Sequence, residues 1–134
     1  MATSTKTEAP QVTRAELVQR ARALIPGLME RAREAEELRT LPEATVRALR
    51  ESGLLRILQP RRFGGYETAL MTLIEVSAAL GEGCGSTSWV FANLASHHWL
   101  LGMFGDKAQQ EREAWERKHN PDYHNSGGLV QPPQ

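Results

Sequence analysis

The chain has 134 residues, with 16 Lys and Arg against 16 Asp and Glu, and 40% of its residues are hydrophobic. This length suits one domain with a modest core. The balanced charge gives no general attraction to nucleic acid or to an anionic membrane surface. The single cysteine, Cys84, excludes an internal disulfide and a cysteine-rich metal site. No apolar run approaches the roughly 20 residues of a membrane helix, and the N-terminus lacks a signal-peptide core, so we expect a cytoplasmic protein.

The N-terminal third of the chain predicts a polar tail followed by a long helix. Residues 1–12 are small and polar, as in a disordered tail. Thr13 and Glu16 have the spacing of a capping box, and apolar side chains then recur at helical spacing to Arg39. Pro26 and Gly27 lie inside this pattern, and proline removes a backbone hydrogen bond. We therefore expect a helix over 13–39 with a kink or a break at Pro26.

The middle of the chain predicts two further helices separated by a turn. Pro42 suits the first position of a helix, and Gly53 suits the left-handed residue that closes it. A short apolar segment at 54–58 leads to a turn at 61–65, where paired glycines disfavour a helix. The next helix is expected over 68–80. Its inward stripe is predicted to consist of Leu70, Leu73, Ile74, Ser77 and Leu80.

The last third of the chain predicts two more helices and a terminal loop. Glycines at 81–85 break the preceding helix, and Ser86 or Thr87 would cap a fourth helix that ends near Leu101. Asp106 and Gln109 resemble another capping box and would open a fifth helix that ends between 115 and 118. Residues 119–134 are expected to form a loop, with a strand beginning at 129–130. The prediction is an all-α domain over 13–118 with about five helices.

The fourth helix carries the residues that most suggest chemistry. Trp89, Asn93 and His97 lie one turn apart and share a face. One interpretation is a ligand-lining wall, in which the indole stacks, the amide hydrogen-bonds and the imidazole binds or moves a proton. The other is that Trp89 fills the core and His97 is a structural histidine whose hydrogen bonds are satisfied. The residues alone leave both interpretations open.

Other polar residues offer weaker candidates. His97 and His98 are adjacent and point about 100° apart on a helix, which is poor geometry for holding one metal ion, and no carboxylate pattern joins His119 to His124. We therefore expect no metal site. The glycines at 81–85 resemble a phosphate-binding loop only faintly, because no strand precedes them. Ser86 and Thr87 would stand at a helix N-terminus, whose free backbone donors could face an anion or the edge of a flavin ring.

Several short segments resemble the N-terminal helical domain of the acyl-CoA dehydrogenase superfamily. Their order and spacing together carry the resemblance, which covers about 14–115. The matching residues are Leu41-Pro42-Glu43, Val46, Leu49, Gly53-Leu54, Gln59-Pro60, Phe63-Gly64-Gly65-Tyr66-Glu67, Phe104-Gly105 and Gln109.

A narrower resemblance points to the two-component flavin-dependent aromatic monooxygenases built on that fold, of the 4-hydroxyphenylacetate and steroid-phenol type. It rests on the run from Gly83 to Thr87, then Trp89, and then His97 eight residues later. In that family a separate reductase supplies reduced flavin, and the oxygenase uses dioxygen to hydroxylate a phenol beside its hydroxyl group. The resemblance implies that Trp89 lies near flavin (FMN or FAD) and substrate. It also implies that His97 orients the phenol and stabilises its deprotonated form.

The same resemblance implies that further domains are needed for catalysis. Family members continue into a β middle domain and a C-terminal helical bundle, which bind most of the flavin and build a tetramer. We therefore expect a truncated domain, inactive alone, with an apolar patch where the other domains would pack. Two alternatives remain: an acyl-CoA dehydrogenase proper, whose catalytic carboxylate normally lies outside this region, and a helical binding or assembly module without chemistry.

Overall fold

The computed structural model describes residues 11–119, and all regular elements in this range are helices. The predicted all-α class is therefore confirmed. The elements are α1 (Arg14–Leu38), α2 (Glu43–Glu51), the short 3-10 helices η1 (Leu54–Arg56) and η2 (Arg61–Phe63), α3 (Leu70–Gly83), α4 (Gly85–Gly102) and α5 (Asp106–His119). Residues 1–10 of the predicted tail and residues 120–134 of the predicted C-terminal loop, including its strand, lie outside the described residues. Residues 11 and 12 precede α1, and His119 is the last residue of α5.

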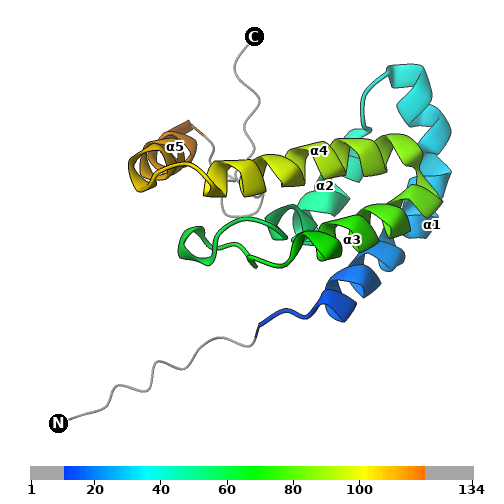
Figure 1. Cartoon of the computed structure of the whole chain (residues 1–134). Coiled ribbons are helices and arrows are strands. Elements are labelled where there is room, and N and C mark those ends of the chain that lie inside the picture. Colours follow the sequence, from blue (N-terminus) through cyan, green and yellow to red (C-terminus); the bar gives the residue numbers. More distant parts are fainter. Residues whose placement is uncertain (1–10, 120–134) are drawn as a thin grey trace.

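Helix α3 is the central packing element, because it contacts α1 on one side and α4 on the other (Figure 1). Helix α5 lies beyond the C-terminal end of α4. The core forms where α1, α3, α4 and the η1 region meet, and this packing removes a continuous set of apolar side chains from water. Its fully buried members include Leu17, Ala21, Leu28, Leu54, Ile57, Val76, Leu80, Phe91 and Ala95.

The ends of α1 follow from its sequence. The Glu16 backbone N–H donates to Thr13 Oγ1 at 3.2 Å, and the Thr13 N–H donates to a Glu16 carboxylate oxygen at 2.7 Å, which confirms the predicted capping box. The helix ends at Leu38, and Arg39 takes the left-handed conformation with φ of 54°. The helix continues through Pro26, so of the predicted kink or break the break does not occur. Pro26 is exposed, so the backbone hydrogen bond that proline cannot form is missing on the surface of the helix and not in the core.

Gly53 closes α2 as predicted. Its φ is 72°, in the left-handed region where residues with a Cβ are strained. A Cβ at this position would also lie 2.5 Å from the hydroxyl oxygen of Tyr66. Glycine therefore serves both the backbone turn and the close approach of Tyr66.

The inward face of α3 differs from the predicted stripe. Leu73 and Leu80 are buried, but Leu70 and Ile74 are exposed at 47% and 55%. The helix instead turns Thr72, Val76, Ala79 and Gly83 inward. Small residues on this side let α1 approach closely: a Cβ on Gly83 would lie 2.9 Å from Leu28 Cβ.

The break between α3 and α4 is narrower than predicted. Helix α3 continues to Gly83, and Cys84 alone is extended, with φ of −162°. Cys84 is the N-cap of α4, so the prediction that Ser86 or Thr87 caps this helix is wrong. The predicted second capping box is also absent. Helix α5 does begin at Asp106, but the Gln109 amide donates to the carbonyl oxygens of Gly102 and Phe104.

Candidate functional site

Helix α4 has two chemically different faces. Thr87, Phe91, Ala95 and His98 recur every three or four residues and are buried. The opposite side carries the three residues singled out from the sequence, Trp89, Asn93 and His97, here called the α4 wall. Since one face is anchored in the core, the other is held in a fixed direction.

The α4 wall is at the surface of the domain. Trp89 is 72% exposed, His97 is exposed, and Asn93 is half-buried between them. The Asn93 Nδ2 donates to the carbonyl oxygen of Trp89 at 2.9 Å, which holds the amide against its own helix. Neither Trp89 nor His97 is therefore a core residue in this domain. The three side chains do share one face, as their spacing predicts.

Ser86 and Thr87 lie on different sides of the first turn of α4. Ser86 is exposed and lines, with Trp89, a groove of about 560 Å³ between the start of α4 and the end of α1. Thr87 is only 1% exposed and faces the core. Of this pair, only Ser86 can present its side chain to a ligand in the groove.

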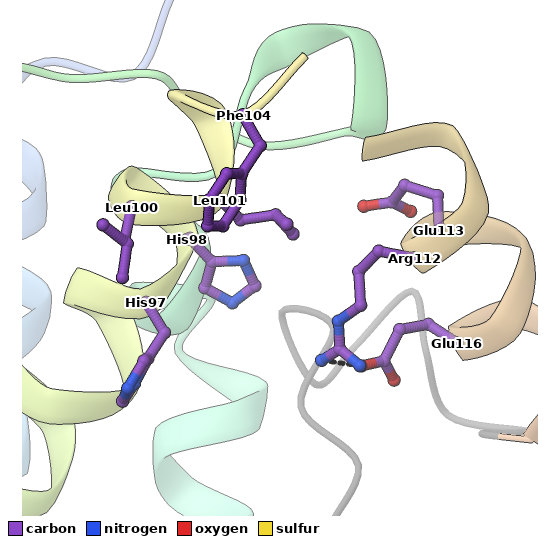
Figure 2. A pocket seen from close by; sticks show the side chains of 8 residues that line it. All are labelled: His97, His98, Leu100, Leu101, Phe104, Arg112, Glu113 and Glu116. Carbon is purple, nitrogen blue, oxygen red and sulfur yellow. Dashed lines mark ion pairs between the residues drawn. The ribbon is translucent and has the colours of Figure 1, made fainter. Parts of the chain in front are cut away.

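A second hollow, of about 270 Å³, lies between the end of α4 and α5 and is shown in Figure 2. Its walls include His97, His98, Leu101, Phe104 and residues of α5. The His98 ring projects from α4 towards Arg112 of α5, whereas the His97 ring points away from α5. The two adjacent histidines therefore face different surroundings.

His98 is the polar residue of this hollow whose importance sequence reasoning missed. It is 6% exposed, and its Nε2 has no hydrogen-bond partner. Burial, together with the positive charge of Arg112 and the neighbouring His97, lowers the pKa of His98 to about 4. The side chain is therefore neutral at pH 7. The available signal was its spacing from Phe91 and Ala95, which places it on the buried stripe.

Two carboxylates of α5 face the same hollow. Burial raises the pKa of Glu113, although the nearby Arg117 charge opposes the shift. Glu116 is almost fully buried and forms an ion pair with Arg112, drawn as a dashed line in Figure 2. The hollow thus combines two histidines and two leucines of α4 with charged side chains of α5.

Other site classes find no structural support within residues 11–119. No group of three or more His, Cys, Asp or Glu side chains there is arranged to hold a metal ion. No helix of this part of the chain is long and apolar enough to cross a membrane.

Comparison with known proteins gives consistent matches. The model of the family "Acyl-CoA dehydrogenase, N-terminal domain" matches residues 12–114. The oxygenase subunit HsaA of a flavin-dependent monooxygenase from Rhodococcus jostii (strain RHA1) is 39% identical over 70% of this chain and 25% of its own length. An FADH(2)-dependent resorcinol hydroxylase, oxygenase component, from Rhizobium sp. (strain MTP-10005) is 41% identical over 68% of this chain and 21% of its length.

Solved structures agree with these matches. The crystal structure of 3-HSA hydroxylase from Rhodococcus sp. RHA1 has a TM-score of 0.71 and 36% identity, covering 80% of this chain and 27% of that chain. The HsaA monooxygenase from M. tuberculosis has a TM-score of 0.73 and 32% identity, covering 83% and 29% respectively.

The chain therefore belongs to the acyl-CoA dehydrogenase N-terminal domain family. Within that family its matched relatives include oxygenase components of flavin-dependent monooxygenases. The chain spans about a quarter of the length of these relatives.

Proposed function

We propose that this domain serves the oxygenase component of a two-component flavin-dependent monooxygenase that hydroxylates a phenolic ring with reduced flavin and dioxygen. The observation that carries the proposal is the exposure of Trp89 and His97 on one face of α4. A 72% exposed indole offers a large, rigid apolar face for packing against a ring. The names of the matched relatives, a flavin-dependent monooxygenase and a resorcinol hydroxylase, favour flavin and a phenol as that partner.

The residues of the groove fit one side of a flavin. The exposed face of Trp89 offers area for stacking against a planar ring, and Ser86 offers a hydroxyl at the same groove. Thr87 supports this turn from the core side. When bound, the reduced flavin supplies the electrons that activate dioxygen. These residues do not select between FMN and FAD, and other domains would provide most of the contacts to the flavin.

His97 has the chemistry needed to bind the phenol. Its imidazole can accept a hydrogen bond from the phenolic hydroxyl and take its proton, which makes the ring carbon beside the oxygen more nucleophilic. Asn93 lies one turn away, and its side-chain oxygen can accept a further hydrogen bond from the substrate. In this proposal Trp89 packs against the ring, and His97 acts on its hydroxyl.

The remaining parts of the proposal concern the whole protein. A separate reductase would deliver the reduced flavin, as the term "oxygenase component" in the relatives' names suggests. The protein would assemble as a tetramer, and the reaction would take place in the cytoplasm.

The test introduces a substitution at His97 into the full-length protein that contains these residues. We expect His97→Asn to lower the rate of phenol hydroxylation by about 10²-fold or more, because proton transfer by a positioned group is worth roughly that factor. Flavin binding should remain unchanged. The matched control is His119→Asn, which removes an exposed imidazole from α5.

Two results would contradict the proposal. Unchanged hydroxylation in His97→Asn would remove His97 from the mechanism. Oxidation of an acyl-CoA thioester instead of a phenol would assign the protein to acyl-CoA dehydrogenases, and failure to bind any flavin would favour a non-catalytic helical module.

A further inference from the structure

A hollow lined by arginines lies where α1, α2 and η1 meet, and the α4 wall takes no part in it. Its volume is about 400 Å³, within the range of small-molecule sites. It is here called the arginine hollow. Its lining residues are Arg20, Arg50, Glu51, Ser52, Gly53, Arg56 and Tyr66.

Arg20 is held in a defined position within this hollow. Its Nη1 donates to the Ser52 carbonyl oxygen at 3.2 Å and to the Tyr66 hydroxyl at 3.1 Å. The guanidinium carbon also lies 5.8 Å from the centre of the Tyr66 ring, within the range of a cation–π contact. Gly53 makes this arrangement possible, because a Cβ there would collide with the Tyr66 hydroxyl. These contacts order one guanidinium before any ligand arrives, which lowers the entropy cost of binding.

The charges of the arginine hollow are unbalanced. Arg20, Arg50 and Arg56 come from three different elements, and Glu51 is the single carboxylate among the lining residues. Within residues 11–119 none of the three arginines forms an ion pair with a carboxylate, whereas Arg33, Arg47 and Arg62 elsewhere do. The chain as a whole is neutral, so this local excess of two positive charges is a feature of the fold and not of the composition.

We propose that the arginine hollow binds a phosphate group, either inorganic phosphate or the head of a small phosphate ester. A phosphate monoester carries close to two negative charges at pH 7 and has three acceptor oxygens. Three guanidiniums approaching from different elements can contact these oxygens with charge-assisted hydrogen bonds. A carboxylate, with one charge and two oxygens, would use the site less completely.

The test is a titration of the ¹⁵N-labelled chain with sodium phosphate at constant ionic strength, followed through the backbone amides of Ser52, Gly53 and Tyr66. We expect saturable shifts at these amides. Arg50→Gln should weaken binding by about tenfold, since a hydrogen bond to a charged group contributes roughly that factor. Arg50 is exposed and has no hydrogen bond or ion pair to another side chain among the described residues, so its loss should not disturb the fold.

Two further variants distinguish phosphate binding from a purely structural role of the arginine hollow, because a stated direction of change in phosphate affinity is expected for each. Glu51→Gln removes the opposing charge and should tighten phosphate binding by about threefold. Arg22→Gln removes an equal positive charge from an exposed position of α1 outside the hollow, and should change binding by less than about twofold.

The ligand series separates the sources of the phosphate. Tighter binding of phenyl phosphate or glycerol phosphate than of inorganic phosphate would support an ester as the ligand, and equal binding would support the free ion. The proposal is overturned if no saturable shift appears, if Arg22→Gln and Arg50→Gln weaken binding equally, or if acetate, a single carboxylate, binds as tightly as phosphate.

Discussion

Adjacent His97 and His98 show how one step along a helix changes the chemistry of a side chain. Successive residues point about 100° apart, so the exposed His97 and the 6% exposed His98 belong to different environments. The burial that depresses the pKa of His98 to about 4 also couples this residue to folding. In the unfolded chain the same imidazole would have its ordinary pKa near 6.5.

His98 should make the stability of the domain depend on pH between about 6.5 and 4. In this window the unfolded chain binds a proton at His98 and the folded chain does not, so the free energy of unfolding falls as the pH falls. The loss attributable to His98 should approach about 3 kcal/mol by pH 4. His98→Phe should abolish this part of the dependence, and urea unfolding of both proteins at several pH values measures it.

Comparing the native chain with His98→Phe separates the pH dependence of stability due to His98 from that due to Glu113. The pKa of Glu113 is raised by burial, so its contribution to stability has the opposite sign and falls as the pH rises. This contribution is common to both proteins and cancels in their difference. His97→Phe controls for the loss of an imidazole from α4. Equal pH profiles for the native chain and His98→Phe would show that His98 is not buried in solution.

The site residues differ in how far their positions could be predicted. The common face of Trp89, Asn93 and His97 follows from spacing alone, because helical geometry fixes it. The burial of His98 and Thr87 does not, since it depends on which side of α4 meets other elements. The spacing groups His98 and Thr87 with Phe91 and Ala95, but it does not by itself decide that this side of α4, and not the side with Trp89, faces inward.

At the scale of elements, α1 shows that a helix can continue through an internal proline. The capping box at Thr13 and the amphipathic pattern up to the left-handed Arg39 favour one long helix. Tertiary contacts between α1 and α3 stabilise it further. These terms outweigh the loss of a single hydrogen bond at an exposed proline. The predicted break therefore does not occur.

Replacing Pro26 should strengthen α1. Pro26→Ala restores a backbone donor inside the helix and should raise the free energy of unfolding by about 2 kcal/mol, after allowing for the greater freedom of the unfolded chain. The reverse change at another exposed interior position, Ala23→Pro, should lower it by about 3 kcal/mol. Thermal and urea unfolding would measure both. An unchanged midpoint for Pro26→Ala would mean that the helix is already relaxed around the proline.

Helix α3 shows why a predicted stripe can be partly wrong: Leu73 and Leu80 are buried as predicted, but Leu70 and Ile74 are exposed. Leu70 and Ile74 are as apolar as Leu73 and Leu80, so the periodic pattern did not select between them. The choice followed from packing: the side with Ala79 and Gly83 permits the close approach of α1. The exposed leucine and isoleucine remain on the other side.

At the scale of the whole molecule, the α4 wall is open to solvent. The groove beside Trp89 would cover a flavin from one side only, whereas enclosed sites bury most of their ligand. Water would have free access to the reacting atoms, which disfavours oxygen-activating chemistry.

We therefore expect the 134-residue chain alone to bind reduced flavin weakly. An anaerobic titration followed by tryptophan fluorescence should show gradual quenching without a break at one flavin per chain. Trp89→Phe should remove most of this quenching, whereas Trp115→Phe on α5 should retain it. A sharp break at a one-to-one ratio would contradict the open-wall description.

The sequence by itself determined the all-α class, the approximate limits of the helices, the capping box of α1 and the left-handed Gly53, because each depends on interactions within a few residues. It also placed Trp89, Asn93 and His97 on one face. Only the tertiary structure decided which faces of α3 and α4 are buried, where His98 lies, and that Arg20, Arg50 and Arg56 meet around one hollow. These features join residues distant along the chain, and their positions depend on how helices with apolar residues on several sides choose their packing partners.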